Sequence, residues 1–283
     1  MLANLPIEDI CYSHKGFTIH GLAYGHESDD IVLCLHGWLD NAASFLPMLP
    51  LFTNKRVIAI DWPGHGYSSH RSFDAHYHFI DWVYDLVQLF EINQWKNIDV
   101  VGHSMGGMVA SAFAAAFPEK VKSLTLIDTI GFISMAAEQS TTQLRQGMLS
   151  RLKGLNKIKS KHISEDSAVN ARVSVSDLNY EQAALIIRRG IAQQQEHFVW
   201  RADSRLRAIS PYRLTLAQAE QFIRDIKIPV QLIYGSKGHD MVVKGVKHFG
   251  PLFERFISHK LKGGHHVHME QPQATVRLIN EFI

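Results

Sequence analysis

The stretch IDVVGHSMGGMVASAFAAAF, residues 98–117, determines a local structure around which the rest of the chain can be placed. Its first four residues form an apolar run typical of a buried strand, and its last ten are mostly small, as in a closely packed helix. Between them, the pattern G-x-S-x-G at 102–106 is typical of a sharp strand-to-helix turn that exposes its central serine. We therefore predict that Ser104 is a nucleophile, with the backbone N–H of Met105 as one donor to an oxyanion.

Short apolar runs bounded by Gly, Pro, Asp or Asn recur on both sides of this stretch. They lie at 31–35, 57–60, 124–127 and 230–234. Apolar residues at helical spacing occur between them, most clearly at 79–90. This alternation predicts a mostly parallel central sheet flanked by helices, an α/β class. The first thirty residues instead predict a small antiparallel start, with 17–24 as one of its strands.

The alternation stops between residues 131 and 214, where the clearest pattern, at 183–191, is helical. We predict a core domain formed by 1–130 and 215–283, with 131–214 inserted as a helical cap, or lid. Lys and Arg outnumber Asp and Glu by 13 to 7 in the insertion. This excess either favours carboxylate-bearing substrates or forms a solvated cap surface, and the second reading is favoured by a basic run with few apolar neighbours. That run is Arg151, Lys153, Lys157, Lys159 and Lys161.

Composition narrows the class of protein. A chain of 283 residues with 46% hydrophobic and 20% charged side chains is long and apolar enough to fold around a core. Its net charge of +2 gives no reason to expect a nucleic-acid or membrane partner. The two cysteines, Cys11 and Cys34, lie in strand-like stretches, and neither a secretory signal nor a membrane-spanning run is evident. We expect a cytoplasmic protein and leave its oligomeric state open.

Two further segments carry a family resemblance. His36-Gly37-Trp38 follows the strand predicted at 31–35, and DWPGHGYS at 61–68 follows the next one. Together with GHSMG they make the chain resemble the α/β-hydrolases over nearly its whole length. The segments WLDNAASF, IDTIGF and HVHMEQP resemble the branch called serine hydrolase-like proteins. The fold expected from this resemblance is an α/β-hydrolase fold with a cap, and Trp38 is the candidate for the second backbone donor to the oxyanion.

A nucleophilic serine needs a base and an acid that orients the base. The family ending G-G-H, read here as Gly263-Gly264-His265, implies that His265 is the base, with His266 or His268 as the other candidates. Two carboxylates are candidates for the acid. Asp128 ends the strand at 124–127 and needs no insertion, so we favour it. Asp240 serves if the loop after 230–234 carries two extra residues, because glycine (Gly238) holds the usual acid position there.

These residues predict a serine hydrolase that cleaves a carboxylic ester of a small molecule through an acyl-enzyme, with the cap selecting the substrate. No spacing typical of a metal site is present, and no cofactor is expected. Hydrolysis of a thioester or of a carbon–carbon bond by the same three groups remains an alternative. A ligand-binding protein that has lost turnover is a further alternative, which intact Ser, His and Asp disfavour.

Overall fold

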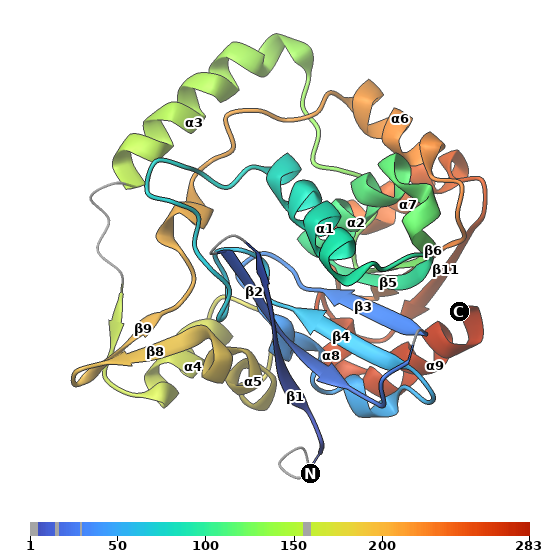
Figure 1. Ribbon diagram of the computed structural model, residues 1–283. Coiled ribbons are helices and arrows are strands. Elements are labelled where there is room, and N and C mark those ends of the chain that lie inside the picture. The colour runs from blue at the N-terminus through green and yellow to red at the C-terminus, as the bar shows by residue number, and fades with distance from the viewer. Residues whose placement is uncertain (1–4, 15–16, 29, 155–159) are drawn as a thin grey trace.

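The computed structural model describes residues 5–14, 17–28, 30–154 and 160–283 (Figure 1). Within these ranges the strands are β1 Glu8–His14, β2 Phe17–Tyr24, β3 Ile31–Leu35, β4 Arg56–Ile60, β5 Ile98–His103, β6 Val121–Ile127, β7 Lys161–His162, β8 Ile191–Gln194, β9 His197–Trp200, β10 Val230–Gly235 and β11 Phe256–Leu261. The α-helices there are α1 Phe79–Asn93, α2 Met105–Ala116, α3 Ser140–Gly154, α4 Glu165–Val173, α5 Tyr180–Gly190, α6 Leu216–Asp225, α7 Asp240–Phe249, α8 Val267–Glu270 and α9 Pro272–Phe282.

Eight strands form the central sheet in the order β1-β2-β4-β3-β5-β6-β10-β11. The pairs β1–β2 and β2–β4 are antiparallel, and every pair from β4 to β11 is parallel. The predicted mostly parallel sheet with an antiparallel start is therefore confirmed. The edge strand β11 was not marked by an apolar run, because most of its side chains are only partly buried or exposed.

Both faces of the sheet are buried, which explains the uninterrupted apolar runs. Along β3, Leu33 and Leu35 belong to the apolar core that contains α1 and α2, whereas Val32 and Cys34 belong to the core that contains α9. Figure 1 shows α1, α2, α6 and α7 on one side of the sheet and α8 and α9 on the other. Because β3, β5, β6 and β10 are neighbours that run parallel, the loops after them meet at one edge, where ligands bind in open α/β sheets.

The segment 131–214 lies outside the central sheet. Its ends lie side by side, because the backbone N–H of Met135 donates to the oxygen of Leu214 (2.9 Å). It contains α3, α4 and α5, and also a three-stranded antiparallel sheet in the order β7-β9-β8. The insertion was expected to be helical, and this small sheet beside its helices was not predicted. The three strands have two to four residues each, too few for a period-two pattern to stand out.

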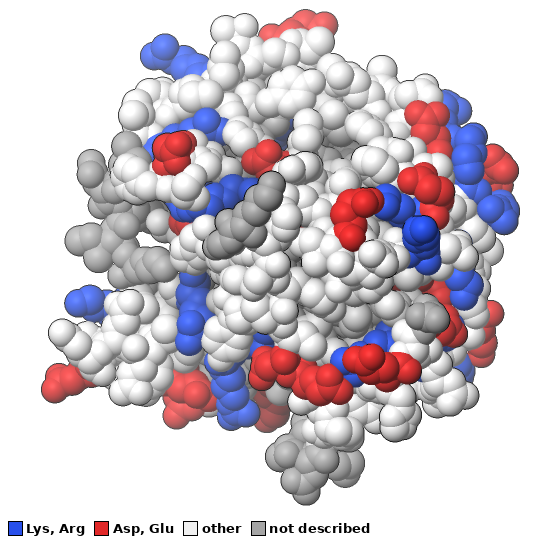
Figure 2. Space-filling model, viewed as in Figure 1, with Lys and Arg blue, Asp and Glu red and all other residues white. Residues whose placement is uncertain are grey.

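Acidic and basic side chains are interspersed on the face of the molecule that Figure 2 shows. Figure 2 shows Lys and Arg side chains next to Asp and Glu side chains over much of one face. Of the predicted basic run, Arg151, Lys153 and Lys161 are partly buried or exposed, while Lys157 and Lys159 lie outside the described residues. None of the helices in the described ranges has the length and apolar composition needed to cross a bilayer.

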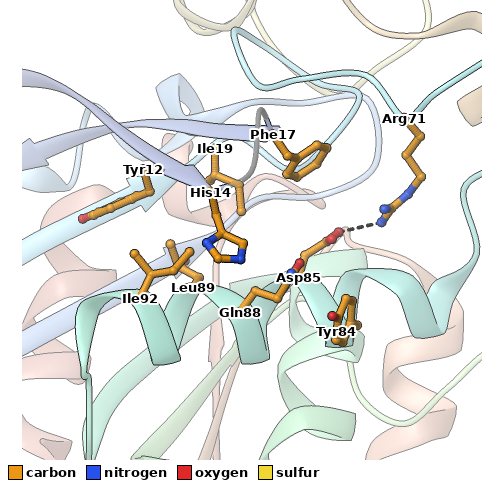
Figure 3. Close-up of a pocket in the computed structure, with 10 residues that line it drawn as sticks. All are labelled: Tyr12, His14, Phe17, Ile19, Arg71, Tyr84, Asp85, Gln88, Leu89 and Ile92. Carbon is orange, nitrogen blue, oxygen red and sulfur yellow. Dashed lines mark hydrogen bonds and ion pairs between the residues drawn. The ribbon is translucent and has the colours of Figure 1, made fainter.

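A small pocket of about 190 Å³ lies between the β1–β2 hairpin and α1 (Figure 3). An ion pair between Arg71 and Asp85 (2.6 Å) lies at one side, and apolar side chains such as Leu89 and Ile92 line the other. This pocket does not contain any of the predicted site residues, and three of them, Trp38, Ser104 and His265, line a larger cleft at the carboxyl ends of the strands.

Candidate active site

Ser104 lies at the turn between β5 and α2 with a strained backbone. Its φ of 50° and ψ of −119° are unfavourable for a residue with a side chain. A Cβ at Gly102 would lie 2.5 Å from the Cα of Gly107, and a Cβ at Gly106 would lie 2.2 Å from the oxygen of Leu35. Glycine is therefore required at both positions, because the turn packs directly against its own helix and against β3. The turn presents Ser104 to the cleft.

Two backbone N–H groups flank this serine. Met105 is the first residue of α2, and Trp38 follows Gly37, where a Cβ would lie 3.2 Å from the Cβ of Ser104. Neither the N–H of Trp38 nor that of Met105 donates a hydrogen bond within the described ranges. Both are therefore available to an oxygen atom bound beside Ser104. The indole of Trp38 points to the inserted segment and donates to the oxygen of Leu206 (3.0 Å).

His265 lies in the loop before α8, with its Nδ1 2.7 Å from Oδ2 of Asp128. The Asp128 side chain is fully buried, and its Oδ1 accepts the backbone N–H of Gly235 (3.0 Å). This arrangement orients the imidazole and places a proton on Nδ1, which leaves the lone pair on Nε2. Ser104 Oγ forms no hydrogen bond to another described residue. Such contacts often form fully only when substrate binds.

The two candidate acids lie in different environments. Asp240 is exposed at the first turn of α7, and among the described residues it forms no hydrogen bond or ion pair with His265. Asp128 contacts His265, and a Cβ at Gly238 would lie only 2.3 Å from its Oδ1. The carboxylate of Asp128 thus occupies the space next to the position where the loop after β10 has glycine instead of an acid. The structure brings Asp128, and not Asp240, to His265.

A cleft of about 670 Å³ opens over these groups. The core contributes Trp38, Ser104 and His265 to its lining, and the inserted segment contributes residues 172 and 174–177. The residues predicted as nucleophile, base and oxyanion donor thus meet in one cleft, and part of its wall comes from the insertion.

Comparison with known proteins shows the family to which this chain belongs. A family profile described as alpha/beta hydrolase fold matches residues 30–272. The chain belongs to the α/β-hydrolase family. This α/β-hydrolase is 30% identical to a serine hydrolase-like protein of Danio rerio over 94% of its own length and 85% of the relative's. It is also 27% identical to a 2-hydroxy-6-oxo-2,4-heptadienoate hydrolase of Pseudomonas putida, over 85% of its own length and 83% of the relative's.

A solved structure agrees with the sequence comparisons. The crystal structure of a hypothetical protein from Pseudomonas aeruginosa PAO1 superposes on this α/β-hydrolase with a TM-score of 0.92. The two are 32% identical, and the match covers 97% of this chain and 99% of that one. The resemblance to the α/β-hydrolases and to their serine hydrolase-like branch is confirmed.

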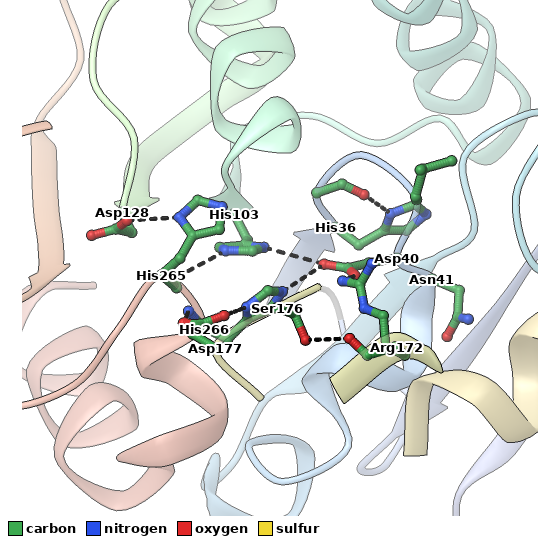
Figure 4. Close-up of polar contacts among 12 residues, drawn as sticks. His36, Asp40, Asn41, His103, Asp128, Arg172, Ser176, Asp177, His265 and His266 are labelled. Atoms are coloured by element: carbon green, nitrogen blue, oxygen red, sulfur yellow. Dashed lines mark hydrogen bonds and ion pairs between the residues drawn. The ribbon is translucent and has the colours of Figure 1, made fainter. Parts of the chain in front are cut away.

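A second set of polar groups in this α/β-hydrolase was missed by sequence reasoning. His266 lies between two carboxylates, with Nδ1 2.5 Å from Asp177 and Nε2 3.2 Å from Asp40 (Figure 4). Burial alone would lower the pKa of His266, but Asp40 and Asp177 outweigh it and raise the pKa to about 9. Burial opposes ionisation of Asp40, yet Arg172 and His266 hold its pKa well below the ordinary value. Both ring nitrogens of His266 therefore face carboxylates, whereas for His265 only Nδ1 does so.

Of the other histidines near the cleft, His103 and His268 are buried, whereas His239 is exposed and its ring centroid lies 4.1 Å from that of His265. His103 Nε2 lies 3.1 Å from the backbone oxygen of His265. The ring centroids of His103 and His265 are 4.6 Å apart. Burial lowers the pKa of His103 far below the ordinary value, and neighbouring imidazoles lower it further. His268 is fully buried against Phe45. No local spacing could have predicted these contacts, because the groups come from segments far apart in the sequence.

Proposed function

We propose that this chain is a serine hydrolase that cleaves a carboxylic ester with Ser104 as nucleophile, His265 as base and Asp128 as the orienting acid. The observation that carries the proposal is the position of Ser104 on a strained turn in the same cleft as an imidazole held by a buried carboxylate. The order of the three residues along the sequence, Ser, then Asp, then His, also agrees with the order in the family.

The proposed reaction has two steps. Ser104 Oγ attacks the carbonyl carbon while its proton moves to Nε2 of His265, and the alcohol then leaves with that proton. The N–H groups of Trp38 and Met105 stabilise the negative oxygen of each tetrahedral intermediate. Water next attacks the acyl-enzyme, giving one proton to His265, and the acid leaves as Ser104 recovers its proton. Asp128 stays ionised and stabilises the imidazolium.

The inserted segment 131–214 is proposed to act as the cap that selects the substrate, because residues 172 and 174–177 form part of the cleft wall. The proposed substrate is a small acyl ester, and neither a cofactor nor a metal takes part in the reaction. A second candidate reaction is carbon–carbon bond hydrolysis, since the substrate in the name of the Pseudomonas putida relative carries a ketone and no ester.

The test combines active-site labelling with a substrate panel. Purified protein is expected to react with a fluorophosphonate probe, and Ser104→Ala to lose both labelling and turnover of nitrophenyl esters. Ser174→Ala is the matched control, because Ser174 lines the same cleft but its hydroxyl donates to the oxygen of Ala171. Unchanged turnover in Ser104→Ala would contradict the proposal.

The panel contains esters of graded acyl length, a thioester and a vinylogous diketone. Preferred turnover of an ester supports the proposed substrate class, whereas preferred turnover of the diketone supports the second candidate. Labelling of Ser104 without turnover of any member would reject this choice of substrates and leave the nucleophile in place.

A further inference from the structure

Three buried side chains that the proposed ester hydrolysis does not use lie together beside Ser104. Asp40 comes from the loop after β3, His103 from the end of β5, and His266 from the loop before α8. One ligand atom from each residue lies within 4.8 Å of those from the other two. Oδ2 of Asp40 is 3.2 Å from Nε2 of His266 and 3.7 Å from Nδ1 of His103 (Figure 4). All three residues line the cleft.

In each of these three side chains, the polar atom that points away from the cluster has another partner. His103 Nε2 faces the backbone oxygen of His265, so it carries the proton and leaves a lone pair on Nδ1. Nδ1 of His103 is buried and has no hydrogen-bond partner. Nδ1 of His266 faces Asp177, and Arg172 donates to Oδ1 of Asp40 (2.5 Å). Histidines that bind metals are held in this way, with the second ring nitrogen donating to a carboxylate or a backbone oxygen.

The separation of the three atoms suits a small cation. Zinc binds imidazole nitrogen and carboxylate oxygen at about 2.0 to 2.2 Å, so neighbouring ligand atoms in a tetrahedral site are roughly 3.4 Å apart. The distances of 3.2 and 3.7 Å from Asp40 Oδ2 bracket this spacing, and the ligand nitrogens of His103 and His266 lie within 4.8 Å of each other. Two imidazoles and one carboxylate are typical ligands for divalent transition metals and zinc, whereas magnesium and calcium prefer oxygen ligands.

We propose that Asp40, His103 and His266 form a binding site for one zinc-like divalent cation, whose remaining coordination position opens to the cleft. The cation replaces the proton that His266 shares with Asp40, and this proton is released to solvent. With His266 neutral, Asp40, Asp177 and Arg172 carry a net charge of −1, which favours a divalent cation. The proposal does not depend on the chemistry of Ser104.

The test measures metal binding directly on tag-free protein that has been treated with a chelator and dialysed. Equilibrium dialysis against Zn²⁺ is expected to give one tightly bound ion per chain. Co²⁺ is expected to give the intense visible absorption of a four-coordinate site with nitrogen ligands, and Zn²⁺ to remove it. Absence of this absorption together with no bound Zn²⁺ would overturn the proposal from the wild-type protein alone.

Variants then locate the ion among the other histidines of the chain. His266→Gln and Asp40→Asn are expected to lose the Co²⁺ absorption, and Asp177→Asn to weaken binding roughly 10-fold to 100-fold because it removes only an outer partner. Asp128→Asn and His248→Gln are the controls, one beside the cluster and one on the exposed face of α7, and both are expected to bind as the wild type does. A signal that persists in both ligand variants, or that is lost in His248→Gln, would place the ion elsewhere and overturn the proposal.

Discussion

Gly238 and Asp128 share one site at the ends of two neighbouring strands. The loop after β10 approaches the carboxylate of Asp128 so closely that a Cβ at position 238 would lie within 2.7 Å of both its oxygen atoms. Asp128 itself has a φ of 45°, an unusual value for a non-glycine residue, which indicates that the end of β6 is constrained to place this carboxylate. The carboxylate therefore depends on Asp128, which carries it, and on Gly238, which leaves the space that it occupies.

The first prediction separates the two candidate acids. Asp128→Asn is expected to reduce kcat by about 10³-fold to 10⁴-fold, because the amide no longer holds the imidazole in the required tautomer or stabilises its charged form. Asp240→Asn, which changes an exposed carboxylate of the same size, is expected to stay close to the wild type. Steady-state turnover of an ester identified by the panel checks both variants. Equal losses, or a larger loss in Asp240→Asn, would reject Asp128.

The second prediction moves the acid between strands. Gly238→Ala is expected to displace the carboxylate of Asp128 and to reduce kcat roughly 10²-fold, as small misplacements of reacting groups do. In the double variant Asp128→Gly with Gly238→Asp, the new carboxylate enters the same space and is expected to recover part of the activity that Asp128→Gly loses. Turnover measured for the single and double variants checks this. A double variant no more active than Asp128→Gly would contradict the shared site.

At the scale of elements, strands buried on both faces could be predicted from sequence and exposed ones could not. The runs at β3 and β10 are continuous because both sides of each strand face apolar neighbours. The edge strand β11 and the short strands of the insertion mix polar and apolar residues, so their sequences resemble loops. The turn that carries Ser104 could be predicted because five consecutive residues, 102–106, specify it. The contacts of His266 were not, since Asp40 and Asp177 reach it from distant segments.

The third prediction concerns α5, which contacts the core through Arg189. This buried guanidinium pairs with fully buried Asp61 (2.9 Å) and with Asp9 (2.9 Å). Arg189→Gln leaves Asp61 buried without its partner and is expected to lower the free energy of unfolding by about 3 to 5 kcal/mol. The neighbouring Arg188, an exposed residue paired with Glu165, provides a matched control, and Arg188→Gln is expected to cost less than about 1 kcal/mol.

Urea unfolding followed by circular dichroism measures both arginine variants. A comparable loss in the two would show that the ion pair across the boundary between α5 and the core does not stabilise the fold. Asp61→Asn in the Arg189→Gln background is expected to recover part of the loss, because it removes the unpaired charge.

At the scale of the whole molecule, the near-neutral net charge combines two parts of opposite sign. The insertion has 13 basic and 7 acidic residues, a charge of +6, and the remainder has 16 basic and 20 acidic residues, a charge of −4. Pairs between the parts, Arg172 with Asp40 and Arg189 with Asp61 and Asp9, lie at their boundary. The basic excess of the insertion thus serves partly to hold it on the core, which neither sequence-based reading anticipated.

Several of the 17 histidines affect the stability of the whole fold, because they are buried in the neutral form. His36 Nε2 accepts the backbone N–H of Trp62 and Nδ1 faces the oxygen of Gly37, while His65 Nε2 accepts the N–H of Leu39 and Nδ1 faces the oxygen of Pro63. Each ring is thereby required to be neutral. Burial lowers the pKa of His36 to about 4 and that of His65 to about 3.

The fourth prediction follows from the direction of these shifts. In the unfolded chain both imidazoles have a pKa of about 6.5, so between about pH 6.5 and 4 the unfolded state binds more protons than the folded state. The stabilisation is complete above this range and is lost as the pH falls through it, by about 2 kcal/mol for each histidine at about pH 5. Asp85, whose pKa burial raises to about 6, acts in the opposite direction over the same range, so the wild-type profile alone does not isolate the histidines.

His36→Gln isolates one of these contributions, since the amide oxygen replaces Nε2 as an acceptor but does not titrate. The variant is expected to be less stable at about pH 7, through altered packing, yet to lose about 2 kcal/mol less than the wild type on going to about pH 5. Urea unfolding at the two pH values measures this difference, with the exposed His248→Gln as the control expected to follow the wild type. If His36→Gln loses as much stability as the wild type, neutral burial of His36 does not contribute to the acid sensitivity of the fold.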